Sequence, residues 1–311
     1  GDTMKGRLFT LIVCGALLSF TIYKLDSIVN ITKKFFNNTQ KVIVENKNQY
    51  AKNKDYDFVQ ITDSFVPYNY QELLNIFYTV LDSGYETFTF YCPNEYLDCL
   101  EDVKKISNPE NVDILTTIGN FVSPYNNFTS LKVQFDTSGE VNLDIKRLYS
   151  DEDIVNISNK IDSIWKNIVT SDMSNEDIIY EFHDYIVNNT KYDEAYETEV
   201  KNGSTTHASA KASGPLFEGY GICSGYTDVM SIVLDKLGYE NYKVASKTHV
   251  WNALKINGKW KHIDLTWDDP VSEDHSVNNI LHKFYLIDTE SLEEFDIKDH
   301  TFDKSIYVEL K

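Results

Sequence analysis

The stretch that decides the fold spans residues 219–237 and reads GYGICSGYTDVMSIVLDKL. Its apolar residues recur at helical spacing, and Gly238 provides a stop, so a helix is predicted with Cys223 at or just before its first turn. Unpaired N–H groups and the positive end of the dipole at a helix start favour the thiolate form of a cysteine. Cys223 is therefore a candidate nucleophile. From position alone, a buried structural cysteine is an equally good interpretation.

A second stretch predicts a hairpin. Asn257-Gly258 is the preferred two-residue hairpin turn, so Ile256 pairs with Lys259. Because side chains alternate along strands, this register sorts the residues into two faces. One face carries His249, Trp251, Asp264 and Thr266, and the other, which suits a core, carries Val250, Leu254, Ile256, Ile263, Leu265 and Trp267. A shift of one residue would place the histidine and the aspartate on opposite faces.

His249 and Asp264 are diagonal neighbours in this register, with backbones roughly 7–8 Å apart. The carboxylate can hold the imidazole in one tautomer while the other ring nitrogen faces Cys223. His262 lies on the same face and is the alternative base. His249 is preferred because its strand leads directly from the cysteine helix and its carboxylate partner is diagonal. His183, on another predicted helix, is interpreted as a partly buried surface histidine.

Four motifs follow one another in the chain: GYGICSGY at 219–226, HVWN at 249–252, GKW at 258–260 and DLTWDDP at 264–270. Together they resemble the transglutaminase-like superfamily, above all its bacterial transglutaminase/protease-like branch, which is similar to the kyphoscoliosis-peptidase and cytokinesis-protein groups. The likeness extends over about residues 174–270. It implies a papain-like α+β fold in which the cysteine helix packs on an antiparallel sheet. It also implies that Cys223, His249 and Asp264 act as nucleophile, general base and orienting acid.

The sequence departs from animal transglutaminases at Ser224, where those enzymes carry a tryptophan, and this speaks against processive protein crosslinking. The residues and the resemblance together predict a thiol enzyme that acts on amide bonds through a thioester. Water would resolve the thioester in a protease or amidase, which is the preferred interpretation, and an amine would do so in a transglutaminase. The alternative is a non-catalytic surface module that binds or scaffolds through the same cleft.

The expected substrate is a protein or peptide, with cell-envelope peptides among the candidates. The residues expected to contact it are Tyr220, Tyr226 and Trp251. Glycines 219, 221 and 225 would let a backbone or a substrate approach closely.

Composition and cysteine spacing bear on the partners, cofactors and disulfides that the chain could have. The 311 residues are 42% hydrophobic and 14% aromatic, which is ample for packed cores. A net charge of −19, without a run of basic residues, excludes a nucleic-acid partner. No cofactor is expected, and the cysteine spacing gives no metal site. Cys92 and Cys99 could form a disulfide outside the cell or place two thiols in a core. Asp268-Asp269 is interpreted as a capped turn rather than a calcium site.

The N-terminal segment Leu8–Tyr23 is mostly apolar and follows Lys5 and Arg7. As a helix it would extend about 24 Å, close to the ~30 Å hydrocarbon core of a bilayer. No small-x-small cleavage pattern follows it. We therefore expect a single-pass anchor in the cell membrane with the catalytic domain outside the cytoplasm, and secretion after cleavage as the second choice.

The sequence divides into four predicted regions: an anchor or signal at 1–25, a stalk at 26–60, a small α+β accessory domain at 61–150 and the catalytic domain at 151–311. The accessory domain is expected to contain a helix from a cap at Asn69 to Gly84, a strand at 85–91, a helix at 95–106 and a hairpin of 131–135 with 141–145. Ser150 and Ser174 each open a helix through a capping box. Residues 191–222 are expected to be mostly loop.

Overall fold

The computed structural model describes residues 48–111, 113–196, 208–269 and 280–311. The predicted anchor and most of the predicted stalk lie outside these residues. Within the described ranges, no helix is long and apolar enough to cross a membrane.

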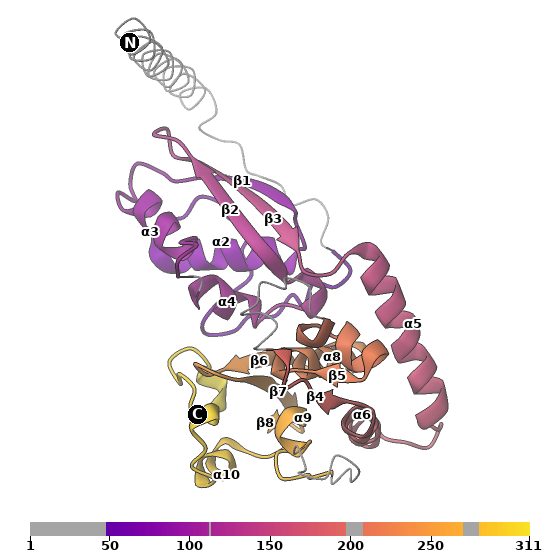
Figure 1. Ribbon diagram of the computed structural model, residues 1–311. Coiled ribbons are helices and arrows are strands. Elements are labelled where there is room, and N and C mark those ends of the chain that lie inside the picture. The colour runs from indigo at the N-terminus through magenta and orange to yellow at the C-terminus, as the bar shows by residue number, and fades with distance from the viewer. Residues whose placement is uncertain (1–47, 112, 197–207, 270–279) are drawn as a thin grey trace, which may run out of the picture.

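The N-terminal region combines one antiparallel sheet with short helices (Figure 1). Its strands are β1 (Thr87–Tyr91), β2 (Phe128–Phe135) and β3 (Glu140–Arg147), in the order β1-β3-β2. Its helices are α2 (Tyr70–Asp82), α3 (Cys99–Ile106), α4 (Asp113–Gly119) and η1 (Pro124–Asn126). The Asn69 side chain accepts from the Glu72 N–H, which makes it the predicted cap of α2. The β2–β3 hairpin also has the predicted pairing, whereas α4 was not predicted.

Residues 48–60 correct the predicted stalk. Tyr56 and Val59 are buried in the core, and the Lys52 ammonium bonds to Asn241 and to Asp235 in the C-terminal half of the chain. The stretch was predicted to be a stalk because most of its residues are polar, but its few apolar side chains pack into the core. In the same region Cys92 and Cys99 are both buried and form a disulfide with a Cα–Cα distance of 5.7 Å.

Two capped helices connect this region to the C-terminal half. They are α5 (Asp151–Ile168), which runs along the side of the molecule in Figure 1, and α6 (Asn175–Asn189). Both predicted capping boxes are present: Ser150 pairs with Asp153, and Ser174 pairs with Asp177. These local signals fixed the start of each helix.

The C-terminal half is built on a second antiparallel sheet of β6 (Asn241–Ala245), β7 (Val250–Ile256) and β8 (Lys259–Ile263), on which helix α8 (Cys223–Leu237) packs. Before α8 the chain forms β4 (Lys191–Tyr192), η2 (Ala208–Ala210), η3 (Gly214–Glu218) and β5 (Tyr220–Gly221). After β8 come α9 (Leu265–Asp268), α10 (Thr289–Glu294), η4 (Lys298–His300) and η5 (Val308–Leu310). The mixed α+β class is therefore as predicted.

The predicted hairpin register is confirmed from Ile256↔Lys259 to Asn252↔Ile263. It does not continue to Asp264, because the chain leaves the sheet there and Asp264 becomes the N-cap of α9. The aspartate thus reaches the histidine from a helix start rather than across a strand pair.

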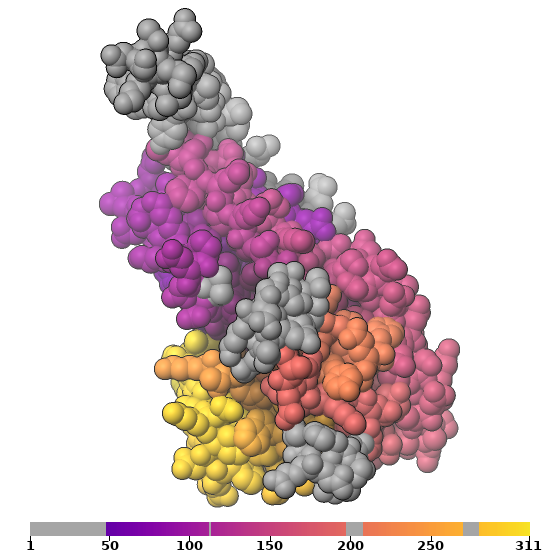
Figure 2. All heavy atoms as spheres, in the orientation of Figure 1, coloured from indigo at the N-terminus to yellow at the C-terminus, as the bar shows by residue number. Residues whose placement is uncertain are grey.

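Both faces of β7 are buried, which corrects the prediction of one polar face. Leu254 and Ile256 join the core around α6 and α8. Trp251 and Ala253 join a second core that also contains residues of the N-terminal sheet and of the C-terminal segment. Figure 2 shows the C-terminal residues, in yellow, packed against the orange residues of the sheet. Residues distant in sequence therefore cover the face that the hairpin alone left open.

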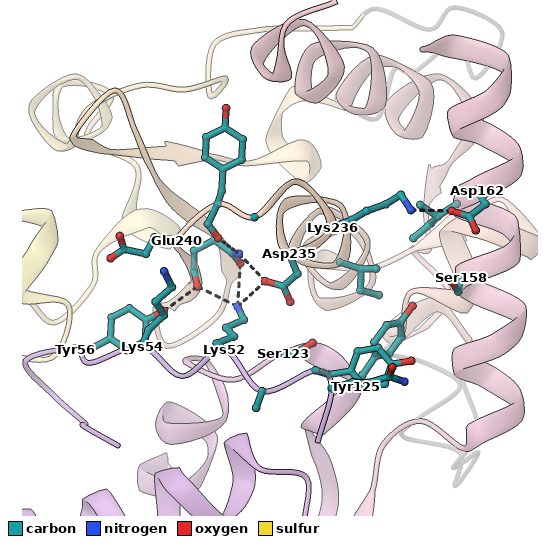
Figure 3. Close-up of a pocket in the computed structure, with 18 residues that line it drawn as sticks. Lys52, Lys54, Tyr56, Ser123, Tyr125, Ser158, Asp162, Asp235, Lys236 and Glu240 are labelled. Atoms are coloured by element: carbon teal, nitrogen blue, oxygen red, sulfur yellow. Dashed lines mark hydrogen bonds and ion pairs between the residues drawn. The ribbon is translucent and has the colours of Figure 1, made fainter. Parts of the chain in front are cut away.

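A cavity of about 380 Å³ lies where residues 49–56, α5 and the C-terminal end of α8 meet (Figure 3). Lys52, Tyr125, Asp162 and Asp235 are among its lining residues. Cys223 is at the other end of α8, so this cavity is separate from the predicted chemistry.

Candidate active site

Cys223 is the first residue of α8, as the sequence predicted. The preceding residue, Ile222, is extended and supplies no side-chain cap, so the start of the helix is left without a competing acceptor from that residue. Cys223 is half-buried and is the free cysteine of the described residues. This position combines a helix N-terminus with partial access to solvent, as thiol nucleophiles require.

The glycines around Cys223 allow two backbone segments to approach each other closely. A Cβ at Gly225 would lie 2.3 Å from the Ser209 carbonyl oxygen, and one at Gly214 would lie 2.5 Å from the Tyr220 carbonyl oxygen. Gly219 has a φ of +70° and ends η3. The loop before the cysteine therefore passes directly over the first turn of α8, and only glycine leaves room for it there.

His249 lies just before β7 and connects Cys223 with Asp264. Its Nε2 is 2.6 Å from Asp264 Oδ2, and Cys223 is close enough to its ring to contribute to the raised pKa of the imidazole. Since Nε2 faces the carboxylate, Nδ1 is the nitrogen left for the sulfur. Of its surface only 8% is exposed. The three residues that the sequence selected are thus brought together.

Asp264 is held by the backbone of its own helix. Oδ1 accepts from Thr266 N at 3.0 Å and from Trp267 N at 3.3 Å, which leaves Oδ2 for the histidine. The side chain is 2% exposed. An N-cap has a fixed direction, so Asp264 can orient the imidazole more rigidly than a side chain on a free strand could.

His300 is a residue that the sequence analysis missed. Its Nε2 lies 2.8 Å from Asp264 Oδ2, the same oxygen that contacts His249, and the residue is 4% exposed. Its Nδ1 is buried without a hydrogen-bond partner among the described residues. The neighbouring Asp299 accepts from Thr248 Oγ1 at 2.7 Å, which ties this C-terminal turn to the residue before His249. The sequence contains no motif that identifies His300, because its contact with Asp264 joins residues 36 positions apart in the chain.

Electrostatics favours a charged His249–Asp264 pair. Burial opposes a charge on His249, but the charge and hydrogen bond of Asp264, together with Cys223, outweigh it and raise the pKa of His249 to about 10. Burial likewise opposes ionisation of Asp264, yet the charge and hydrogen bond of His249 and those of His300 hold the pKa of Asp264 below its usual range. An imidazolium at neutral pH can stabilise a thiolate on Cys223.

His262, the alternative base, is occupied elsewhere. Trp251 Nε1 donates to its Nδ1 at 3.0 Å, and its Nε2 lies 3.0 Å from Thr289 Oγ1. Burial, and then the charge of His300, lower the pKa of His262 to about 3. A neutral histidine with both nitrogens engaged is a structural residue, so the preference for His249 agrees with this arrangement.

Only one of the three predicted substrate contacts is accessible. Tyr220 is 49% exposed, whereas Tyr226 is 1% exposed and Trp251 is fully buried. The Tyr226 hydroxyl donates to Asp269 Oδ2 at 2.6 Å, and the Trp251 ring stacks on His249 at 5.7 Å. Tyr226 and Trp251 therefore support the site from within the core, which corrects their predicted role.

His183 is also placed differently from the prediction. It is fully buried on α6, and its Nε2 lies 3.0 Å from Asp268 Oδ2. Asp268 Oδ1 in turn accepts from the Phe284 N–H at 3.0 Å. Asp268 thus links α6, α9 and the segment that follows.

No protein-family model and no curated protein matches the chain. Among solved structures, it is similar to one described as a TGase, with 14% identity, a TM-score of 0.32, and coverage of 51% of this chain and 49% of that one. It is also similar to a protein from Cytophaga hutchinsonii whose description proposes a cysteine protease, with 16% identity, a TM-score of 0.26, and coverage of 44% and 61%. The chain thus spans about half of the first structure and three fifths of the second.

Proposed function

We propose that the chain is a thiol enzyme of the transglutaminase-like class, with Cys223 as nucleophile, His249 as general acid and base, and Asp264 as the orienting carboxylate. The observation that carries this proposal is the placement of His249. Its buried ring is fixed by Asp264 through Nε2, and Cys223, at a helix start, is near enough to influence the pKa of the imidazole. A structural cysteine has no need of such a partner.

The reaction follows from these positions. The Cys223 sulfur attacks the carbonyl carbon of a peptide or carboxamide, and the proton held by His249 passes to the departing amine or ammonia. A thioester and a neutral imidazole remain. His249 then removes a proton from water or from an incoming amine, whose attack on the thioester breaks the C–S bond, releases the product and regenerates the thiolate beside the protonated His249.

Hydrolysis is the preferred second step. Ser224, which stands where animal transglutaminases carry a tryptophan, donates its hydroxyl to the Ala210 carbonyl at 2.9 Å. Ser224 therefore holds the loop before Cys223 in place. It does not supply the indole ring that a tryptophan would place beside the thioester. Tyr220 is the exposed side chain nearest in sequence to Cys223 and is proposed to contact the substrate, a protein or a peptide.

An extracytoplasmic location is part of the proposal. The buried Cys92–Cys99 disulfide supports it, because such bonds persist in oxidising compartments. The apolar segment Leu8–Tyr23 suggests how the chain would be retained at the membrane.

The test is activity on a peptide library, with and without a fluorescent primary amine as acceptor. Cys223→Ala and iodoacetamide should each abolish both product formation and capture of the amine, while circular dichroism shows an unchanged fold. Product without incorporated amine identifies a hydrolase, and labelled product identifies an acyltransferase. Activity that survives both treatments would refute the mechanism. A folded protein whose Cys223 resists iodoacetamide at neutral pH would support the binding module instead.

A further inference from the structure

A second group of imidazoles and carboxylates lies at the far end of α9 from Asp264. Asp184 Oδ1 is 2.9 Å from His183 Nδ1 and 2.7 Å from His282 Nε2. These three atoms lie within 4.8 Å of one another. His183 and Asp184 belong to α6, and His282 belongs to the segment after α9, so the group joins two separate parts of the chain.

The surroundings of this group are those of a metal ligand set. Histidines that bind a metal through one nitrogen nearly always donate the other N–H to a carboxylate or carbonyl. His183 does this: its Nε2 faces Asp268 Oδ2 at 3.0 Å, and both side chains are fully buried. The His282 ring is also oriented, because Tyr180 stacks on it at 4.8 Å with 9° between the planes.

Both nitrogens of His183 face carboxylate oxygens, Nδ1 that of Asp184 and Nε2 that of Asp268. A neutral imidazole carries one N–H, so with Nε2–H donating to Asp268 the free Nδ1 can bind a cation beside Asp184. Asp184 and His282 have side chains 24% and 33% exposed, so solvent can reach this side of the group. A water could complete the coordination.

We propose that His183 Nδ1, Asp184 Oδ1 and His282 Nε2 bind a divalent transition-metal ion such as zinc. Asp268 would orient His183 by accepting a hydrogen bond from its other ring nitrogen, Nε2. Two imidazoles and a carboxylate suit zinc, whereas magnesium and calcium prefer oxygen ligands alone. Zinc bonds of 2.0–2.2 Å separate tetrahedral ligand atoms by about 3.3 Å. Asp184 would have to withdraw by about half an ångström from each nitrogen, which its partial exposure allows.

The ion would act as a clamp on the segment that follows α9. It would hold His282 to α6, while Asp268 already bonds to His183 and to the Phe284 N–H. This role is independent of the proposed thiol chemistry, because the clamp contains none of its three residues.

The experiment uses the full chain without an affinity tag, carrying Cys223→Ala so that the thiol cannot bind zinc. After equilibrium dialysis against zinc, metal analysis should find about one ion per chain. The melting temperature should rise by about 5 °C at saturation. Cobalt should give visible ligand-field absorption, and calcium and magnesium should have no effect.

The ligand variants are Asp184→Asn and His282→Ala, both at partly exposed positions that should still fold. Each should lose the bound zinc and the thermal shift, whereas Lys283→Ala, next to His282, should keep both. Zinc binding unchanged in His282→Ala would overturn the proposal. Absence of zinc from the Cys223→Ala parent would overturn it as well. Neither result depends on peptide activity.

Discussion

A cluster of two histidines and a carboxylate lies near each end of the four-residue helix α9, with Asp264 of its N-cap in the first cluster and Asp184 of α6 in the second, and we propose a different chemistry for each. At its start, Asp264 bonds to His249 and His300, and all three side chains are buried. At its end, Asp268 supports His183, and solvent reaches the outer pair of Asp184 and His282. Among the described residues, only the first cluster lies beside a free cysteine. The two proposals therefore assign the same kinds of side chain to different roles, a proton relay where the cluster is buried beside a thiol and a metal ligand set where solvent reaches it.

The largest contrast is expected between the two carboxylates of α9. Asp264→Asn should reduce kcat/KM by about 10⁴. The amide oxygen would take the two helix N–H groups, so the NH2 group would face His249 Nε2 and favour the wrong imidazole tautomer. Asp268→Asn should reduce it by less than tenfold, because Asp268 touches neither His249 nor Cys223. Steady-state kinetics on one peptide substrate would measure both. Equal losses in the two variants would mean that α9 acts only as a structural unit.

Variants of His300 in the first cluster and of His282 in the second should differ in their effect on kcat, which is the second largest contrast. His300→Ala should lower kcat by about tenfold with little change in KM, because Asp264 Oδ2 loses one of its two side-chain donors and holds His249 less firmly. His300→Gln, which retains an N–H donor, should recover part of the loss. His282→Ala should leave kcat within about twofold. If His300→Ala and His300→Gln lower kcat equally, the loss of the hydrogen bond to Asp264 does not explain the lower kcat.

The pH dependence provides the third test. The pKa of His249 is raised to about 10, so the imidazolium that protonates the leaving group persists through neutral pH and is lost as the pH rises through that value. The profile of kcat/KM should therefore fall on its alkaline side near pH 10. The stabilising contribution of the pair should be complete below about pH 6.5, decline as the pH rises above that value and be lost by about pH 10, because the pKa of His249 is higher in the folded than in the unfolded state. Circular dichroism at each pH would exclude unfolding as the cause, and an alkaline limb near pH 7 would contradict the charged pair.

The smallest effect concerns Asp269, the C-cap of α9. Burial, only partly offset by the Tyr226 hydrogen bond, raises the pKa of Asp269 to about 6. Because its folded pKa is raised, stability falls as the carboxyl ionises between its ordinary pKa and pH 6. Asp269→Asn should therefore raise the melting temperature by about 2 °C at pH 8 and have little effect at pH 4. A stabilisation that is equal at both values would rule out relief from a buried charge.

The sequence was informative wherever a signal is local. The capping boxes at Ser150 and Ser174, the cap at Asn69 and the turn at Asn257-Gly258 depend on residues within a few positions of each other, and the structure contains all of them. The same holds for α8, whose apolar spacing and terminal glycine placed Cys223 at its start.

The errors arose where distant segments meet. Trp251 and Tyr226 look like accessible aromatics beside the motifs, but the C-terminal segment and α9 bury them. Tyr56 and Val59 lie in a stretch of polar composition and are nonetheless core residues. Burial depends on the whole arrangement, so periodicity in one segment could not predict it.

By itself, the sequence determined the three residues of the candidate site, the helix that presents the cysteine and the strand pair beside it, because propensity, capping and turn chemistry act over short distances. Only the tertiary structure decided how they are held. It turned Asp264 from a strand residue into a helix cap, brought His300 onto the same carboxylate oxygen and gathered His183, Asp184 and His282 around α9. These contacts join segments separated by tens to about a hundred residues, and packing and burial, rather than local backbone preference, select them.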